Sequence, residues 1–89
     1  MDKKVVIITG ASRGLGLNLV KLLSKDRYRI IATSRTVSDE LEREIDRNPD
    51  IHFHPLDLAE TDSVRPWVKE IKENYGLPYA LINNAALGH

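Results

Sequence analysis

The fold of this chain is decided by the stretch Ile7-Ile8-Thr9-Gly10-Ala11-Ser12-Arg13-Gly14-Leu15-Gly16. An apolar run leads directly into a turn with three glycines, and leucines at helical spacing follow. This order predicts a buried strand, a glycine-rich turn and a helix. The first backbone N–H groups of a helix have no partners within it, and the helix dipole adds partial positive charge there. The stretch therefore predicts an anion site, whose usual occupant is a dinucleotide pyrophosphate.

The three glycines of this turn are expected to serve different purposes. Gly10 allows the sharp exit from the strand, because glycine adopts backbone angles that other residues avoid. Gly14 lets a phosphate approach the backbone with no Cβ in the way, and Gly16 lets the helix pack closely on the strand. The spacing is Gly-x-x-x-Gly-x-Gly rather than Gly-x-Gly-x-x-Gly, but its place at the first strand–helix turn favours dinucleotide binding.

The same turn also fits a hydrolase motif, because residues 10–14 have the Gly-x-Ser-x-Gly pattern of a nucleophile elbow. The strand before such an elbow normally follows several others, and its serine needs an acid and a histidine downstream. Here the motif follows the first strand, and His52, His54 and His89 have no evident role as a base. Phosphate binding, which also accounts for Gly16, is the favoured interpretation.

The composition indicates one small domain. Of 89 residues, 42% are hydrophobic, and 13 basic residues balance 13 acidic ones. A protein that binds nucleic acid or a membrane surface usually has a basic excess, so neither partner is expected. The chain has no cysteine and therefore no disulfide or thiol ligand. Only four apolar residues separate the start at Met1 from the turn, too few for a signal peptide or a membrane span, so a cytoplasmic location is expected.

Strand and helix patterns alternate along the chain, which predicts an α/β fold with right-handed β-α-β units and a parallel sheet. The expected strands are 4–9, 29–33, 51–56 and 79–83, and the expected helices are 14–25, 38–47 and 63–75. The residues expected on the buried helix faces are Leu15, Leu19, Leu22 and Leu23, then Leu41 and Ile45, then Val64, Trp67, Val68, Ile71 and Tyr75. Pro66 favours a start of the third helix at Ser63, because proline is tolerated in a first turn.

Ser34 and Arg35 directly follow the second strand. In a dinucleotide fold this position lies beside the adenosine ribose, where an acidic residue would bind the 2′-hydroxyl. Arginine instead suits a 2′-phosphate, because its planar fork donates charge-assisted hydrogen bonds to phosphate oxygens. Arg13, within the glycine turn, is a second candidate cation. The sequence thus predicts NADP as the cofactor in preference to NAD.

Polar residues also follow the third and fourth strands. Asp57 is placed to bind an adenine amino group while Leu58 covers the ring, although an aspartate here can also simply begin a turn. The run Asn83-Asn84-Ala85-Ala86 ends the fourth strand, at the sheet edge where parallel sheets bind ligands. Its small residues would let a cofactor ribose lie against the backbone.

Three other features favour structural roles. His52 and His54 share a face of the third strand, but no third metal ligand is near, so partly exposed strand histidines are expected. Trp67 and Tyr75 indicate helix packing. The charged second helix indicates a solvated face.

Three motifs in order, residues 9–16, Asp57-Leu58 and Asn83–Ala86, together resemble the N-terminal half of a short-chain dehydrogenase/reductase of the NADPH-dependent 3-oxoacyl-carrier-protein reductase type. The resemblance covers nearly the whole chain and implies a Rossmann-like sheet of strand order 3-2-1-4, with Asn83 bracing its centre. Ala86 stands where the family usually has glycine. The implied cofactor contacts are Gly10, Ser12, Arg13, Gly14, Leu15, Gly16, Ser34, Arg35, Asp57, Leu58, Asn84, Ala85 and Ala86.

The resemblance implies that residues 1–89 are the dinucleotide-binding half of an oxidoreductase that transfers hydride between NADPH and a carbonyl or alcohol. The family's catalytic serine and Tyr-x-x-x-Lys pair lie beyond the Asn-Asn-Ala motif. Tyr28, Tyr75 and Tyr79 have no lysine four residues later. The truncated chain alone is therefore expected to be inactive.

Two other functions can be compared with this one. A non-catalytic dinucleotide-binding or sensing module would bind NADPH without turnover. A flavodoxin-like or receiver-type domain would carry acidic residues where the first strand ends, but Thr9 and Gly10 stand there. The family normally adds strands beside the fourth, so residues 79–83 would form an unpaired apolar edge through which the chain is expected to self-associate.

Overall fold

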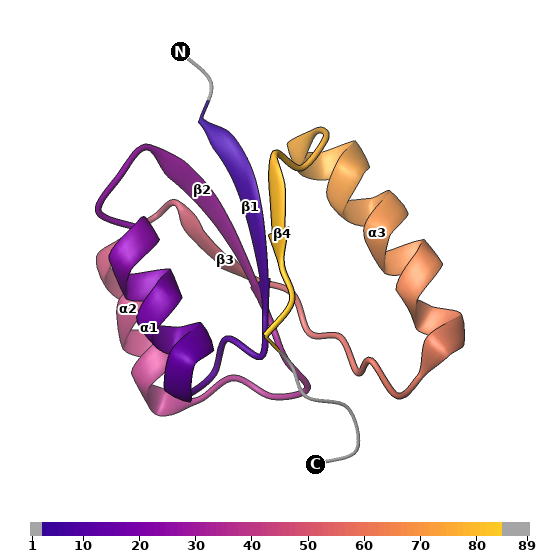
Figure 1. The fold of residues 1–89 in the computed structure, drawn as a ribbon, viewed down its shortest axis with the longest axis horizontal. Helices are drawn as coiled ribbons and strands as arrows, with labels where there is room; N and C mark the ends of the chain where they lie inside the picture. The colour runs from indigo at the N-terminus through magenta and orange to yellow at the C-terminus, as the bar shows by residue number, and fades with distance from the viewer. Residues whose placement is uncertain (1–2, 85–89) are drawn as a thin grey trace.

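The computed structural model describes residues 3–84, in which strands and helices alternate (Figure 1). The strands are β1 (Lys4–Thr9), β2 (Tyr28–Thr33), β3 (Ile51–Phe53) and β4 (Ala80–Ile82). The helices are α1 (Gly14–Leu23), α2 (Asp39–Arg47) and α3 (Thr61–Tyr75). Each predicted element is present, and the predicted α/β class is confirmed.

The strands form one parallel sheet in the order β3-β2-β1-β4, as predicted. β1 pairs with β2 along its whole length, from Lys4 opposite Tyr28 to Thr9 opposite Thr33. On its other side β1 pairs with β4, where Ile7 lies opposite Leu81. The order leaves the outer edge of β4 open in the part of the chain that the structure describes.

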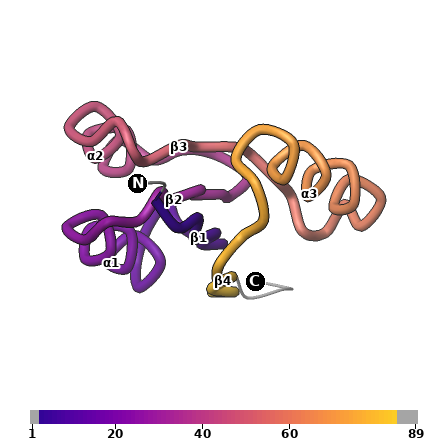
Figure 2. Tube along the Cα trace, turned by 90° about the horizontal axis from the view of Figure 1, so that it is seen from above, coloured from indigo at the N-terminus to yellow at the C-terminus, as the bar shows by residue number. Residues whose placement is uncertain are grey.

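Helices lie on both faces of the sheet, with α1 and α2 on one face and α3 on the other (Figure 2). Successive residues of β1 therefore enter two cores. One core contains Val6 and Ile8 of β1 with Leu17, Val20 and Leu41 of the helices. The other contains Val5, Ile7, Ile31 and Ile71, with Trp67 and Tyr75 packed against them. Burial on both faces explains why β1 is a continuous apolar run.

The predicted buried face of α1 is only partly correct: Leu19 and Leu23 pack against the core, but Leu15 and Leu22 do not. Leu15 and Leu22 are 64% and 60% exposed, whereas Leu17 and Val20 are buried. The reason is Gly16, where an added Cβ would lie 2.1 Å from the carbonyl oxygen of Gly10. The helix is oriented with this glycine against the turn, so the residues one and four positions later face the core. The leucine spacing alone does not reveal which face carries the close contact.

α3 begins at Thr61, so the predicted start at Ser63 is wrong and Pro66 lies inside the helix rather than in its first turn. Proline has no N–H to donate to the carbonyl of Asp62. Both residues are exposed, which leaves that carbonyl near solvent. Gly76, with φ at 91°, ends the helix.

The remaining boundaries differ from the predictions by a few residues. β3 ends at Phe53 rather than residue 56, yet the backbone N–H of Leu56 still donates to the carbonyl of Ser34, which holds this segment beside β2. Val68 of the predicted α3 stripe is 37% exposed, whereas Ile71 is buried. Within residues 3–84 no helix combines the length and the hydropathy that a membrane crossing requires.

Candidate functional site

The predicted site residues within the described range gather at the carboxyl ends of the four strands, at the lower end of the sheet in Figure 1. The glycine turn follows β1, Ser34 and Arg35 follow β2, and Asn84 follows β4. Asp57 comes after the extension of β3 that runs beside β2. Ala85 and Ala86 lie outside the described residues, so the predictions for them are untested.

The glycine turn has the backbone shape that the sequence suggested. Gly10 and Gly14 have φ angles of 62° and 61°, in the left-handed region that favours glycine. An added Cβ at Gly14 would meet no atom within 4 Å, so the space above this residue is open. Gly16 differs, because its Cβ position is filled by the Gly10 carbonyl. The turn thus combines one glycine beside open space with one held against the protein.

The start of α1 lacks acceptors of its own. Arg13 is the N-cap residue in an extended conformation, and its side chain makes no capping hydrogen bond. The first turn contains no acidic residue. The first bond within the helix runs from the N–H of Leu17 to the carbonyl of Arg13, so the N–H groups of residues 14–16 precede the hydrogen-bonded ladder. This geometry suits an external anion.

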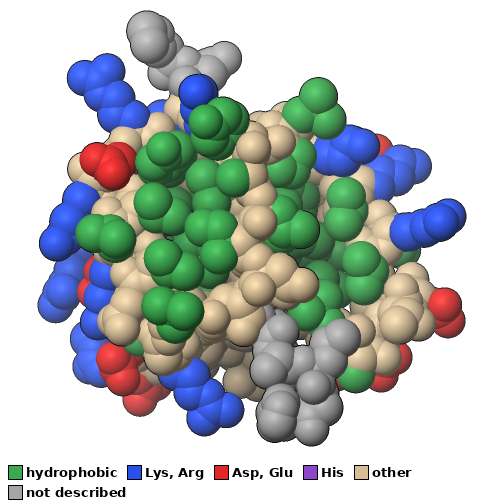
Figure 3. All heavy atoms as spheres, viewed as in Figure 1, with side chains coloured by type: hydrophobic (Ala, Val, Ile, Leu, Met, Phe, Trp, Pro, Cys, Tyr) green, Lys and Arg blue, Asp and Glu red, His purple; other side chains and the backbone are tan. Residues whose placement is uncertain are grey.

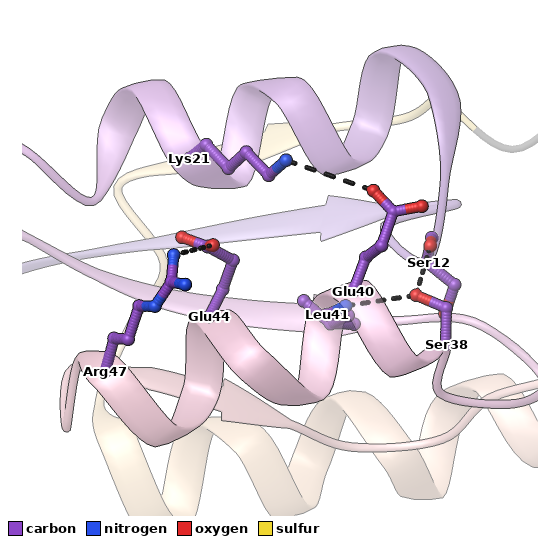
Figure 4. A network of polar contacts seen from close by, with 7 residues as sticks. All are labelled: Ser12, Lys21, Ser38, Glu40, Leu41, Glu44 and Arg47. Carbon is purple, nitrogen blue, oxygen red and sulfur yellow. Dashed lines mark hydrogen bonds and ion pairs between the residues drawn. The ribbon is translucent and has the colours of Figure 1, made fainter.

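A cluster of hydroxyl groups fixes the glycine turn to the loop after β2. The Ser12 and Ser34 hydroxyls lie 2.6 Å apart, and both donate to the carbonyl of Thr36. Ser38 donates to the carbonyl of Ser12 and accepts the N–H of Leu41 (Figure 4). The two loops that would flank a bound dinucleotide are therefore joined by direct hydrogen bonds.

These contacts also bear on the hydrolase alternative. The hydroxyl of Ser12 is engaged by Ser34 and Thr36. His54 instead forms a 2.6 Å hydrogen bond with the Tyr75 hydroxyl, against α3. No His–Ser hydrogen bond of the kind that activates a nucleophile occurs at Ser12 in the described residues.

A cavity of about 530 Å³ joins two predicted cofactor residues, Arg35 and Asp57. Its volume lies within the range of small-molecule sites, which is roughly 300–1,000 Å³. The other lining residues are Pro55, Leu56, Ser63, Pro66, Trp67 and Glu70. Arg35 is exposed and has no carboxylate within ion-pair distance among residues 3–84. Its guanidinium is therefore available to an anion.

Asp57 also has a local role. One of its carboxylate oxygens accepts the N–H of Ala59 at 3.0 Å, and its carbonyl accepts the N–H of Glu60. This is the turn-forming arrangement that the sequence left open. Leu58, the next residue, is half-buried.

The Asn-Asn pair ties β4 to β1. The Thr9 hydroxyl donates to Asn83 at 2.9 Å and accepts the backbone N–H of Asn84 at 2.9 Å. The side-chain amide of Asn84 donates to the carbonyl of Gly10 at 3.4 Å. Asn83 therefore braces the sheet, as expected, and Asn84 lies against the glycine turn.

Sequence reasoning missed three residues of this region. Thr9 links β1 to the Asn pair, and Ser38 joins the two loops. Trp67 lines the cavity, and its buried indole N–H has no hydrogen-bond partner among residues 3–84. Ser38 carried a signal, because a serine followed by acidic residues marks a helix start. Thr9 belongs to the motif of residues 9–16, but that motif does not indicate a bond to Asn83 or Asn84. Trp67 carried no signal beyond its place on an apolar stripe.

His52 and His54 lie away from this site and are half-buried, as expected. Their rings pack on Tyr75, with centroids 5.1 and 5.3 Å from its ring centroid. Burial, together with Arg29 and His54, lowers the pKa of His52, and burial raises the pKa of Tyr75. Among the residues that the structure describes, no cluster of three potential metal ligands is present.

Comparison with known proteins agrees with this geometry. The model of the short chain dehydrogenase family matches residues 4–89. The 3-oxoacyl-[acyl-carrier-protein] reductase of Buchnera aphidicola is 34% identical over 98% of this chain and 36% of its own length. The crystal structure of the Cj0485 dehydrogenase is 30% identical, with a TM-score of 0.87 over 96% of this chain and 33% of that one.

A metagenomic short-chain oxidoreductase in complex with NADP has a TM-score of 0.85 and 29% identity over 99% of this chain and 41% of its own. The chain spans about a third of the length of the curated relatives it matches. Because the family model matches nearly every residue, the chain belongs to the short-chain dehydrogenase family.

Proposed function

We propose that residues 1–89 are the NADP(H)-binding half of a short-chain oxidoreductase that transfers hydride between NADPH and a carbonyl or alcohol. The observation that carries this proposal is the uncapped start of α1, whose glycine turn opens into free space at Gly14. Arg35 and Asp57 line a cavity at the same end of the sheet.

The residues present fit a dinucleotide. The N–H groups of residues 14–16, supported by the helix dipole, would bind the pyrophosphate. Gly16 and the Ser12–Ser34 cluster hold that turn in place without filling the space above Gly14. Asp57 would accept the adenine amino group, with Leu58 against the ring, and Asn84, Ala85 and Ala86 would border the ribose.

The preference for NADP over NAD rests on charge. The residues after β2 are Ser34, Arg35 and Thr36, with no carboxylate to accept a ribose hydroxyl. Arg35 is exposed and free of acidic partners in the described part of the chain, so it can bind a 2′-phosphate through charge-assisted bonds. Arg13, also exposed, adds a cation at the start of α1. The NADP complex of a related structure supports the same cofactor.

The contribution of these residues is binding and orientation. Bound NADPH supplies the hydride. The chain's own tyrosines lack the lysine partner that the family uses for proton transfer, so residues 1–89 are expected to bind NADPH without turnover. A non-catalytic binding or sensing module, the alternative function, makes the same prediction for the isolated chain.

Calorimetry with NADPH and NADH on the 89-residue chain tests the proposal. We expect tighter binding of NADPH, and we expect Arg35→Asp to remove most of that difference while NADH binding changes little. The matched control is Arg43→Asp, which alters charge equally on the exposed side of α2. Failure to bind either nucleotide would contradict the proposal, and equal loss in both Arg variants would contradict the specific role of Arg35.

A further inference from the structure

The cavity beside Arg35 and Asp57 has a further wall, which α3 supplies. The loops after β2 and β3 provide the rest of the lining. The residues from α3 are spaced three and four positions apart, so they share one face of the helix. They are Ser63, Pro66, Trp67 and Glu70. A helix that sequence reasoning assigned only to packing therefore borders the candidate cofactor site.

This wall is separate from the exposed apolar side chains of the molecule. Figure 3 shows the face viewed in Figure 1, on which many hydrophobic side chains gather. The most exposed leucines, none of which lines the cavity, are Leu15, Leu22, Leu77 and Leu81. The cavity is formed beside β2 and β3, whereas β4 lies at the other end of the sheet order. What covers the exposed leucines therefore does not decide what the cavity binds.

Trp67 belongs both to the core and to the cavity. Its half-buried side chain packs against the core of Val5, Ile7, Ile31 and Ile71, and it also lines the cavity. Its indole N–H has no hydrogen-bond partner among residues 3–84, so packing alone sets the angle of the ring. An aromatic ring supported by a core beside a cavity offers a flat surface to another ring.

The lining restricts the chemistry of the ligand. Most of the wall is apolar and comes from two prolines, Leu56 and Trp67. The charged groups are the guanidinium of Arg35 and the carboxylates of Asp57 and Glu70. A matching ligand needs a flat body, an anionic group for the arginine and an N–H donor for a carboxylate. Adenine on a phosphorylated ribose has all three.

We propose that the indole of Trp67 packs flat against the adenine ring of the cofactor, so that α3 takes part in nucleotide binding. This inference rests on the proposed function, in which Asp57 accepts the amino group and Leu58 covers one face of the base. Trp67 supplies the other face. Contact between an aromatic side chain and a base involves the base alone. Trp67 therefore contributes equally to NADPH and NADH binding, whereas Arg35 contributes to NADPH binding.

Fluorescence of the unmodified chain tests this contact directly, because Trp67 is its single tryptophan. The probe is adenosine 2′-monophosphate, with excitation at wavelengths that adenine does not absorb. This probe lacks the nicotinamide ring, so energy transfer to reduced nicotinamide cannot cause quenching. We expect quenching that saturates with the probe. Inorganic phosphate is the control, and we expect it to leave the emission unchanged because it carries no ring.

Calorimetry of two variants separates the contact from a loss of packing. Trp67→Leu keeps an apolar side chain but removes the aromatic face, and we expect it to weaken NADPH and NADH binding by about tenfold each. Tyr75→Leu is the matched control, because Tyr75 packs against the same core but does not line the cavity. We expect it to keep both affinities at a temperature where circular dichroism shows a folded chain.

The outcomes distinguish this inference from the proposed function. Failure of the unmodified chain to bind NADPH would contradict the proposed function and this inference with it. If the chain binds NADPH but saturating adenosine 2′-monophosphate leaves the emission of Trp67 unchanged, the role of Trp67 is overturned and the proposed function stands. The same holds if Trp67→Leu binds as tightly as the unmodified chain. Equal weakening by Trp67→Leu and Tyr75→Leu would also overturn it, because the loss would then come from displacement of α3.

Discussion

The two helices on one face of the sheet begin in opposite ways. α2 has Ser38 as its N-cap, whose hydroxyl accepts the N–H of Leu41 at 3.1 Å, and three carboxylates stand in its first turn. α1 has Arg13 as its N-cap, with no side-chain capping bond and no acidic residue in its first turn. The positive end of the α2 dipole interacts with carboxylates of the chain itself, whereas the positive end of the α1 dipole is available to an external anion.

The difference between the two helix starts separates residues available for binding from residues that hold them in place. A helix start that must accept a ligand cannot use its own side chains to satisfy its N–H groups. It has to be held by other means, and here those means are the contact of Gly16 with Gly10 and the bond from Ser38 to the carbonyl of Ser12. Ser38, which caps α2, thus also helps to hold the uncapped start of α1 in place (Figure 4).

Replacing Gly16 with alanine is expected to have the largest effect. The new Cβ would lie 2.1 Å from the Gly10 carbonyl oxygen and 2.8 Å from the side-chain nitrogen of Asn84. Because the first of these is backbone, the helix must move away from the turn, at a cost of about 3 kcal/mol or more. Urea denaturation would measure the loss.

Gly14→Ala is the matched control for this change. Its Cβ would meet nothing within 4 Å, so only the positive φ angle opposes it, at a cost of about 1 kcal/mol. Equal destabilisation by the two variants would show that the close contact at Gly16 does not hold the start of α1.

Ser38→Ala is expected to have the next largest effect. It removes the cap of α2 and the bond to the Ser12 carbonyl together, which we expect to lower the free energy of unfolding by about 1–2 kcal/mol. Ser63→Ala is the control, because Ser63 donates to the carbonyl of Glu60, the residue before α3, but its side chain caps no helix. If NADPH affinity stayed unchanged in Ser38→Ala at a temperature where the protein is folded, the proposed support of α1 by α2 would be wrong.

Arg13→Asp would give α1 a start like that of α2. Arg13 already has an extended backbone, and a carboxylate there can accept N–H groups of the first turn. We expect the protein to gain about 0.5–1 kcal/mol of stability, since aspartate is a good N-cap. NADPH binding should weaken, because the carboxylate competes for the N–H groups and repels the pyrophosphate.

Arg13→Ala separates these effects, since it removes the same cation but adds no cap. Thermal unfolding and calorimetry should show that Arg13→Asp is the more stable variant and the weaker binder of the two. A variant that gained both stability and affinity would contradict the idea that the open start of α1 is the anion site.

The order of the elements was predictable because each depends on local sequence. The apolar run before Gly10 acts within a few residues, and the strand order followed from the family resemblance. The orientation of α1 was not predictable, because five leucines lie around the helix and a contact between Gly16 and Gly10 decides which of them are buried.

The same distinction applies to the candidate site. Residues that follow strands could be placed at the carboxyl edge from the pattern alone, as with Arg35 and Asp57. Contacts between loops could not be predicted in this way. The bond between Ser38 and the Ser12 carbonyl depends on how α1 and α2 pack against the sheet. The role of Thr9 depends on β4, which lies more than seventy residues later in the sequence.

The smallest expected effect concerns the ion pair that spans the two helices. Lys21 of α1 and Glu40 of α2 lie 4.0 Å apart, with side chains 41% and 61% exposed (Figure 4). Exposed pairs of this kind contribute roughly 0.5 kcal/mol or less, because water and salt screen them. Lys21→Met is therefore expected to change the free energy of unfolding by less than Ser38→Ala, and the change should vanish in high salt. A larger, salt-independent loss would mean that charge, rather than the Ser38 hydroxyl, joins the two helices.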